Sequence, residues 1–317
     1  MRPFPRPPRP CEESHAERNE TLTSRRRSRK NHGEADPFEP LTRVAPGCVR
    51  ILLHNVNGIG FVTGQRSRAT VKLEKLKKLL LANDFSYAAL TEVNKDWRKT
   101  CYRNSIWGAT SSWFEQRRVQ ISHNTTQQPD SEYQVGGTIS MAMGELVYRV
   151  SSQGSDPRRL GRWSTMTTTG KNELQTTIIT CYCPVKGTCT GSAYVQHLKY
   201  MADHRNELPE DMECPRQLFG HDLKAYIDNL QNSGHQLIVL GDFNSEYSDL
   251  EEWMMDLGLV NLLKAKYGSE GPRTCSKSKD SPIDCIFGSP HLLCQRGGIL
   301  SFGRLDSDHR GIYLDLL

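Results

Sequence analysis

The order of apolar segments along the chain predicts a mixed α/β sandwich. Short apolar runs of strand length come singly and in pairs, and helical patterns separate only some of them. A doubly wound parallel sheet would need a regular alternation of strands and helices, which this order does not follow. A chain of 317 residues can bury enough apolar surface to fold without disulfides or a structural metal.

The predicted strands are apolar runs that end at turn-forming residues. Residues 49–54 make the first strand, which Asn57-Gly58 closes with a turn signal. Residues 86–90 make the second strand, which leads into Glu92. The remaining predicted strands are 137–143, 145–150, 162–168, 174–182, 236–240, 283–287, 299–302 and 311–316.

Three segments carry helical patterns. Residues 69–82 place apolar side chains on one side with lysines between them, residues 190–232 are predicted to be mainly helical, and residues 248–257 form a short helix. Residues 94–134 show no period and are predicted to be irregular. The arginines and tryptophans of this last segment suit a DNA-binding groove, but tryptophans more commonly anchor a long loop to the protein body.

Residues 1–46 are predicted to be a disordered basic tail, and residues 47–317 a single folded domain. Proline and arginine alternate through residues 2–10, which suits neither a helix nor a sheet. Residues 1–50 hold 11 Lys/Arg against 7 Asp/Glu, whereas the rest of the chain is nearly balanced. The basic cluster at 24–30 is compatible with nuclear targeting, with a nucleic-acid-contacting arm, or with a solvated tail of no specific role.

Composition argues against a membrane or secreted protein. The mean hydropathy is −0.60, and the chain contains no apolar run long enough to span a bilayer and no apolar leader. Ten cysteines occur without a CxxC pair, which favours reduced thiols over a zinc site. The expected location is therefore intracellular, with the nucleus left open.

Polar residues of a particular kind stand at the ends of the predicted strands. Carboxylate, amide and imidazole side chains at strand ends are held rigidly while they face solvent. Several carboxylates in one cleft repel each other unless a hard cation is present, and Mg²⁺ prefers one or two carboxylates together with water and phosphate. The residues in question are Asn55, Asn57, Glu92, Asp242, Asn244, Asp284, Asp308 and His309.

The order of these motifs resembles the endonuclease/exonuclease/phosphatase superfamily. The matching segments are Asn55-Val56-Asn57-Gly58, Leu90-Thr91-Glu92, Tyr182-Cys183-Pro184, Gly241-Asp242-Phe243-Asn244, Ile283-Asp284 and Ser307-Asp308-His309. The likeness runs from about residue 48 to the last residue. It implies an α+β fold, a four-layer α/β/β/α sandwich of two mixed β-sheets with outer helices, and makes residues 47–317 a catalytic domain.

The resemblance also implies a set of metal ligands. Glu92 would be the main ligand, with Asn55 and Asp308 nearby. The implied cofactor is Mg²⁺, with Mn²⁺ as the alternative. Such an ion would stabilise the charge that develops on a phosphate and on the leaving oxygen.

The other motif residues carry over as catalytic groups. Asp242 would orient or deprotonate the attacking water, and Asn244 would hold that water or the phosphate. His309 would donate to a phosphate oxygen, while Asp284 would fix its ring tautomer. Tyr182 would contact the phosphate through its hydroxyl, unless it is simply a core tyrosine.

Within the superfamily, the chain is most similar to the apurinic-type endonuclease domains of non-LTR retrotransposons. Many phosphatase and sphingomyelinase members carry a His on the strand where this chain has Tyr182. Arg273-Thr274-Cys275 and Ser281-Pro282-Ile283-Asp284 resemble a run of the retrotransposon enzymes. Asn57, Thr274 and Arg162 are assigned to substrate binding on the same resemblance.

The leading hypothesis is therefore a DNA endonuclease that nicks double-stranded DNA and leaves 3′-hydroxyl and 5′-phosphate ends. One alternative is a phosphoesterase that acts on a small or lipid phosphate, against which the missing strand histidine argues. The other is a catalytically inactive nucleic-acid-binding derivative, against which the complete set of catalytic positions argues.

Overall fold

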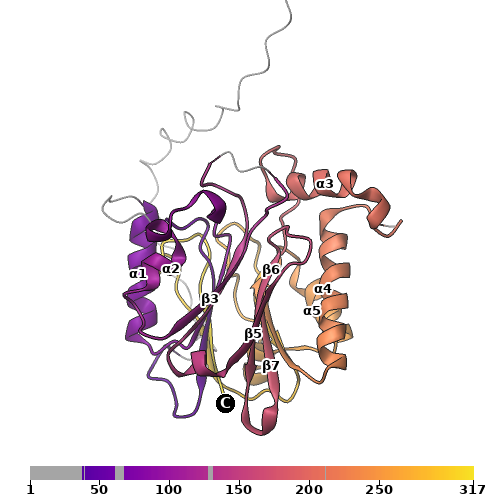
Figure 1. The fold of residues 1–317 in the computed structure, drawn as a ribbon. Helices are drawn as coiled ribbons and strands as arrows, with labels where there is room; N and C mark the ends of the chain where they lie inside the picture. Colours follow the sequence, from indigo (N-terminus) through magenta and orange to yellow (C-terminus); the bar gives the residue numbers. More distant parts are fainter. Residues whose placement is uncertain (1–37, 39, 61–67, 128–130, 211) are drawn as a thin grey trace, which may run out of the picture. The chain divides into compact units, whose positions relative to one another are not determined.

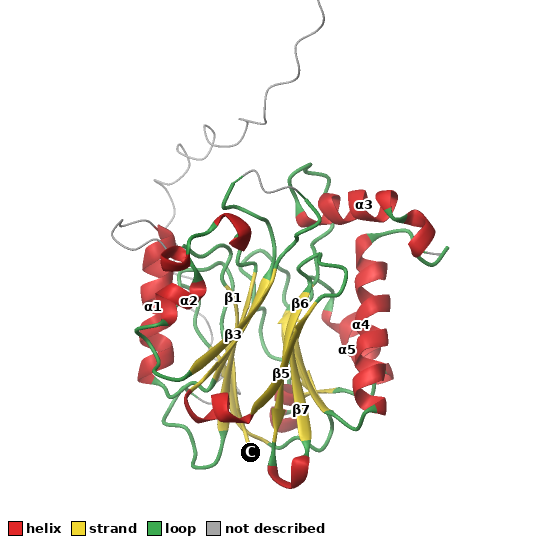
Figure 2. Ribbon diagram, viewed as in Figure 1, coloured by secondary structure: helices red, strands yellow, loops and turns green. Residues whose placement is uncertain are grey.

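Two six-stranded β-sheets pack face to face in this computed structural model (Figures 1 and 2). The structure describes residues 38, 40–60, 68–127, 131–210 and 212–317. The first sheet has the order β11 (Cys294–Ile299), β12 (Ile312–Leu316), β1 (Val49–Asn55), β2 (Tyr87–Thr91), β4 (Thr138–Met143), β3 (Arg117–Ser122). The second has the order β5 (Val150–Ser155), β6 (Trp163–Thr169), β7 (Gln175–Tyr182), β8 (Gln236–Asp242), β10 (Asp284–Gly288), β9 (Val260–Asn261).

Helices cover the outer faces of both sheets (Figure 2). The α-helices are α1 (Arg68–Ala82), α2 (Ile106–Thr110), α3 (Ala193–Asp203), α4 (Pro215–Asn232), α5 (Tyr247–Asp256) and α6 (Leu262–Tyr267). Short 3₁₀ helices are η1 (Trp97–Lys99), η2 (Tyr102–Asn104), η3 (Gly144–Arg149), η4 (Lys171–Glu173) and η5 (Arg205–Glu207). With α1 and α2 outside the first sheet and α4 and α5 outside the second, the expected four-layer α/β/β/α sandwich is confirmed.

The inner strands β1, β2, β8 and β10 are buried on both faces, which explains why they are apolar runs. In β1, Leu52 packs on the helix side of its sheet, while Ile51 and Leu53 point between the sheets because side chains alternate along a strand. Leu76 and Leu80 of α1 pack against the same outer face as Leu52. Apolar burial on both faces of a sheet therefore holds each strand in register.

The register brings several strand ends to one end of the sandwich. Asn55 lies opposite Thr91 in the parallel pair of β1 and β2. Tyr182 lies opposite Asp242 in the parallel pair of β7 and β8, and Asp284 faces Asp242 from the antiparallel β10. Residues far apart in the sequence therefore meet because their strands end together.

Two predicted strands were misplaced, and two edge strands were missed. Residues 144–149 form η3 rather than a strand, because Gly144 turns the chain with a φ of 59° and the ladder resumes only at Val150. The edge strands β3 and β5 were missed because their outward residues are polar and give no apolar run. The strand expected at 299–302 lies earlier, at Cys294–Ile299.

The 94–134 segment is attached to the protein body by its tryptophans. Trp97 and Trp113 are buried in the cluster between α1 and the first sheet, and Trp107 contacts Trp97 edge-on at 5.7 Å. Trp97 and Trp113 therefore anchor the segment to the protein body, whereas Trp107 is partly exposed. Besides α2, the segment contains η1, η2 and the strand β3.

Most of the predicted tail lies outside the described residues. Within the described part, Phe38 is buried and packs edge-on against Tyr267, and the main-chain oxygen of Thr42 accepts a hydrogen bond from the buried Arg50. Packing on the domain thus begins before residue 47.

None of the described cysteines forms a disulfide. Among all the residues that the structure describes, no helix is both long and apolar enough to cross a bilayer.

Candidate active site

A buried carboxylate pair and a histidine form the centre of the candidate site. Asp242, Asp284 and His309 each offer a ligand atom, and these atoms lie within 4.8 Å of one another. Asp242 and Asp284 are each 1% exposed and His309 is 8% exposed. The strand pairing of β8 with β10 sets the two carboxylates opposite each other, so their proximity follows from the sheet itself.

His309 is bound to Asp284 and is held in its charged form. Its Nδ1 lies 2.8 Å from Asp284 Oδ2. Burial alone would lower the pKa of His309, but the charge and hydrogen bond of Asp284 outweigh burial and raise the pKa to about 12. The ring therefore donates through Nδ1 to Asp284, and its side chain also makes a hydrogen bond with Cys275.

Asp242 is held by two asparagines. Asn55 Nδ2 donates to one carboxylate oxygen at 2.8 Å, and the main-chain N–H of Asn244 donates to the other at 3.1 Å. Burial first, and then repulsion from Asp284, raise the pKa of Asp242 well above its usual range. Asn55 itself is fully buried, and its Oδ1 accepts the N–H of Asn57.

Residues around the site have left-handed backbone. The φ angles of Asn57, Glu92, Asn94 and Asn244 are 41°, 50°, 56° and 47°. Asparagine tolerates this region, but for glutamate it is strained by about 1 kcal/mol or more. Because Glu92 follows directly after β2, the turn redirects its side chain from the strand line towards the cleft.

Glu92 and Tyr182 contact each other across the two sheets. The Tyr182 hydroxyl makes a side-chain hydrogen bond with Glu92. Burial, followed by the nearby charges of Glu92 and Asp242, raises the pKa of Tyr182 well above its usual value. The tyrosine ring packs against Gly136, where an added Cβ would lie 3.0 Å from a ring carbon.

Asp308 stands at the rim of the site. Its two oxygens accept hydrogen bonds from Asn57 Nδ2 at 2.8 Å and from Lys277 Nζ at 2.7 Å. Burial opposes ionisation, but these two donors outweigh it and lower the pKa of Asp308 to about 2. Asn57 and Asp308 line one wall of a 590 Å³ cavity whose other walls include Asn94, Tyr133 and Lys277.

Two of the predicted substrate-binding residues do not face the cleft. Thr274 is fully buried, and its hydroxyl accepts the main-chain N–H groups of Ile283 and Asp284 at 3.1 Å each. Thr274 therefore positions the start of β10, because both N–H groups would otherwise be unsatisfied. Its assignment to substrate binding is corrected to this structural role.

Arg162 is also removed from the substrate set. It is fully buried, pairs with Asp156 through two hydrogen bonds of 2.7 Å, and lies 2.9 Å from Asp222. Its guanidinium stacks over Trp163 at 4.7 Å. A fully buried arginine that is paired with two carboxylates does not face solvent, which favours a structural role over contact with a substrate.

Three residues of the site were missed in the sequence. Lys72 on α1 donates to the main-chain oxygens of Val56 and Asn57 at 2.8 and 2.7 Å, which holds the turn after β1. Asn94 accepts the Gly136 N–H, and Lys277 pairs with Asp308. Asn94 could have been found as a further polar residue after β2, whereas Lys72 looked like any lysine of an amphipathic helix.

The side chains present suit a hard divalent cation. Asp284 Oδ1 is buried without a hydrogen-bond partner among the described residues, and Asp242 lies beside the charges of Asp284 and Glu92. Glu92 and Asp308 are partly exposed oxygen donors on the cleft side. An excess of oxygen donors of this kind is what Mg²⁺ or Mn²⁺ binds.

Comparison with solved structures identifies the fold. The chain superposes on an endonuclease/exonuclease/phosphatase family protein from Leptotrichia buccalis with a TM-score of 0.57, at 16% identity and over 85% of this chain and 99% of that one. The fold is that of the endonuclease/exonuclease/phosphatase proteins. The expectation drawn from the motif order is thereby confirmed for the fold.

Two further solved structures share this fold. An AP endonuclease from Leishmania major matches with a TM-score of 0.60, at 13% identity and over 88% of this chain and 93% of that one. A 3′ phosphatase from Neisseria, bound to a product DNA hairpin, matches with a TM-score of 0.56, at 17% identity and over 85% and 99%. Comparisons with models of protein families and with curated proteins gave no match.

Proposed function

We propose that this chain is a divalent-metal-dependent phosphodiester hydrolase that nicks DNA and leaves 3′-hydroxyl and 5′-phosphate ends. The observation that carries the proposal is the buried group of Asp242, Asp284 and His309, whose ligand atoms lie within 4.8 Å of one another. Burying two carboxylates and a cationic ring together is costly, which favours a catalytic role over a structural one.

Glu92 and Asp308 would hold a divalent cation, with Asn55 close behind them. Both carboxylates are partly exposed beside the cavity, and Asn57 orients Asp308 by a hydrogen bond. When bound, the cation supplies positive charge to the phosphate and to the leaving oxygen. Lys277 occupies one oxygen of Asp308 and would have to give it up.

Asp242 and Asn244 would manage the attacking water. Asp242 is held rigidly by Asn55 and by the Asn244 main chain, so its carboxylate can orient a water and accept its proton. The Asn244 amide donates to the Cys183 main-chain oxygen at 2.9 Å, which leaves its own oxygen for the water or the phosphate.

His309 and Tyr182 would hold the phosphate. Because Asp284 takes Nδ1, the imidazolium can donate from Nε2 to a phosphate oxygen on which negative charge builds. The raised pKa of His309 keeps that proton in place near neutral pH. The Tyr182 hydroxyl, now bonded to Glu92, provides a second donor at the end of β7.

DNA as the substrate, and a retrotransposon type of enzyme, rest on two supports. Tyr182 stands on the strand where many phosphatase members of the resembling superfamily carry a histidine, and the segment from Thr274 to Asp284 resembles the retrotransposon enzymes. Of the structures with the same fold, one is an AP endonuclease and another is bound to a DNA hairpin.

Nicking of supercoiled plasmid tests the proposal. The wild type should nick the plasmid with Mg²⁺ and not with a chelator, and a DNA ligase should reseal the nicks because it needs a 3′-hydroxyl and a 5′-phosphate. Asp242→Asn and Glu92→Gln should each lower the rate by about a thousandfold or more.

Two exposed acidic residues of α5 provide matched controls for these variants. Asp256→Asn and Glu252→Gln make the same chemical changes away from the site and should leave the rate unchanged. A folded wild type that leaves plasmid intact but releases phosphate from small phosphoesters would move the substrate to that class. Inactivity towards both would favour the inactive derivative.

A further inference from the structure

A second cavity lies at the edge of the sandwich, away from the site described above. It has a volume of about 460 Å³ and lies between the residues that follow β3 and those that follow β5. Its wall contains Arg98, His123, Thr125 and Arg159. The cavity therefore joins the irregular 94–127 segment of one sheet to the β5–β6 connection of the other.

Two buried polar atoms in this wall lack hydrogen bonds within the described residues. They are His123 Nε2 and Thr125 Oγ1. The side chain of His123 is 10% exposed, and its Nε2 lies 3.5 Å from Asp96 Oδ1, a distance that makes an ion pair only with a protonated ring. Unsatisfied buried polar atoms are costly. Each of these atoms has less than 1 Å² of accessible surface, so a ligand with acceptor oxygens reaches it only when the side chain turns towards the cavity.

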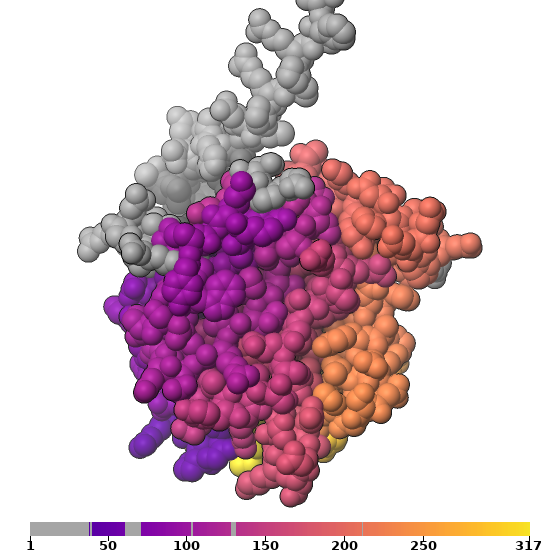
Figure 3. Space-filling model, viewed as in Figure 1, coloured from indigo at the N-terminus to yellow at the C-terminus, as the bar shows by residue number. Residues whose placement is uncertain are grey.

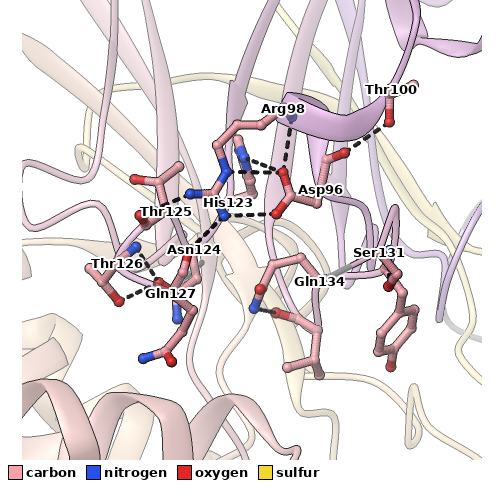
Figure 4. A network of polar contacts seen from close by, with 12 residues as sticks. Asp96, Arg98, Thr100, His123, Asn124, Thr125, Thr126, Gln127, Ser131 and Gln134 are labelled. Carbon is pink, nitrogen blue, oxygen red and sulfur yellow. Dashed lines mark hydrogen bonds and ion pairs between the residues drawn. The ribbon is translucent and has the colours of Figure 1, made fainter. Parts of the chain in front are cut away.

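Charge in and beneath the cavity is balanced except at one residue. Arg98 Nη2 forms an ion pair with Asp96 Oδ2 at 2.7 Å, and the guanidinium donates to the main-chain oxygens of Thr125 and Gln127 (Figure 4). Asp156, at the cavity floor, is paired with Arg162. The guanidinium of Arg159 is exposed and has neither an ion pair nor a side-chain hydrogen bond in the described part of the chain.

The main chain presents Arg159 from a rigid base. Its N–H donates to the Asp156 oxygen at 2.9 Å, and its own oxygen accepts the Thr125 N–H at 2.9 Å. Its φ is 61°, a left-handed conformation that glycine would adopt without strain. A long cationic side chain at such a position points to use of the side chain, since the backbone alone favours glycine.

The cavity and the catalytic group lie at the same end of the sandwich. Ser122, the last residue of β3, pairs with Thr138, which in turn pairs with Thr91 beside Glu92. β3 is three strands from β1, and β5 is three strands from β8, which gives a separation of about 14 Å at about 4.8 Å per strand. A duplex covers about 14 Å of its axis in about four base pairs.

The helix α3 packs against the β3–β4 connection at this end of the sandwich. Asn124 donates to Gln196 of that helix at 2.9 Å, and Gln134 donates to the same side-chain oxygen. Figure 3 shows the residues after β3, in magenta, against the salmon-coloured surface of α3. The helix α3 is therefore hydrogen-bonded to the described residues on both sides of the β3–β4 connection.

We propose that this cavity binds a backbone phosphate of the polynucleotide substrate, about four nucleotides from the bond that is cut. The proposal rests on the proposed function for the identity of the substrate. Arg159 supplies the unbalanced positive charge from an exposed position, and Thr125 Oγ1 and His123 Nε2 donate after their buried side chains turn towards the cavity. Arg98 positions the loop by holding its main-chain oxygens.

Binding of a fluorescent duplex of about 20 base pairs, measured by anisotropy in a chelator, tests the proposal without any cleavage. Arg159→Gln should weaken binding roughly fivefold and lower the slope of log affinity against log salt by about 0.9. Arg149→Gln is the matched control, because Arg149 is exposed at the opposite end of β5. Equal losses in both variants would show a general charge effect and overturn the proposal.

Thr125→Val separates binding from folding. The change removes a buried hydroxyl that has no hydrogen bond among the described residues, so the melting temperature should stay the same or rise. DNA binding should nevertheless weaken roughly threefold, because one donor to the phosphate is lost. Unchanged binding in a folded Thr125→Val variant would overturn the role of the cavity.

The combined results distinguish a failure of this inference from a failure of the proposed function. If inorganic phosphate stabilises the wild type but not Arg159→Gln, while both bind DNA equally, the cavity takes a free anion and the polynucleotide proposal falls. If the wild type nicks plasmid, and Arg159→Gln binds DNA as tightly as the wild type, the proposed function stands and this inference falls. If the protein nicks no plasmid, but Arg159→Gln weakens DNA binding and Arg149→Gln does not, the inference stands and the proposed function falls.

Discussion

Replacement of Arg162 by methionine should destabilise the protein without weakening substrate binding. Removing one partner from a buried ion pair costs about 3 to 5 kcal/mol, because the other charge is left uncompensated. Asp156 would keep hydrogen bonds from the main-chain N–H groups of Arg158, Leu160 and Arg162, so the loss should be at the lower end, about 3 kcal/mol. Asp222 would keep Arg158, which lies 2.6 Å away.

Urea unfolding of the wild type, Arg162→Met, Asp156→Asn and the double variant measures this effect. The double variant should be less destabilised than the sum of the single variants, because the uncompensated charge is absent from it. The KM for DNA should stay within about twofold in all folded variants, because the guanidinium does not face the cleft. An unchanged free energy of unfolding, or a raised KM with full stability, would refute the structural role of Arg162.

Four further outcomes can be measured. Thr274→Val should lower the free energy of unfolding by about 2 kcal/mol, whereas Thr274→Ser should not, since only valine leaves two N–H groups unsatisfied. Gly136→Ala should lower kcat about tenfold or more, because its Cβ would displace the Tyr182 ring. Lys277→Met should lower the Mg²⁺ concentration that gives half-maximal nicking, and a raised requirement would contradict competition for Asp308.

The fourth concerns acid stability. Burial opposes ionisation of Asp222, but hydrogen bonds from Arg158 and Arg162 outweigh it and lower its pKa. A depressed folded-state pKa means that this stabilisation is full above the ordinary carboxyl range and is lost as the pH falls through the folded value. Asp222→Asn should therefore flatten the acid limb of the stability curve, and an unchanged limb would contradict the pairing.

The proximity of Asp242, Asp284 and His309 could be predicted because each of them stands next to an apolar run in the sequence. Each residue of the group stands at the end of an apolar strand, and strand ends bring their side chains together once the sheets form. The pairing of Asp242 with Asp284 is such a case, since the register of β8 and β10 places them opposite each other.

The parts that could not be predicted depend on contacts between distant residues. Arg162 follows a glycine and precedes an aromatic residue, as in a substrate-binding loop, but its partner Asp222 is 60 positions away and closes it off from solvent. Thr274 likewise depends on two N–H groups of the β10 strand. The edge strands β3 and β5 were missed because half of each strand faces water, so the apolar signal is absent.

The left-handed backbone at Glu92 has a consequence for how such a gene can change over time. Glycine at this position would relieve about 1 kcal/mol of strain, so a single replacement would make the folded protein more stable while it removes the proposed metal ligand. Loss of the proposed activity through this replacement would therefore raise the stability of the folded protein. A lineage that had no use for cleavage would be expected to lose this glutamate early and to keep a well-folded chain.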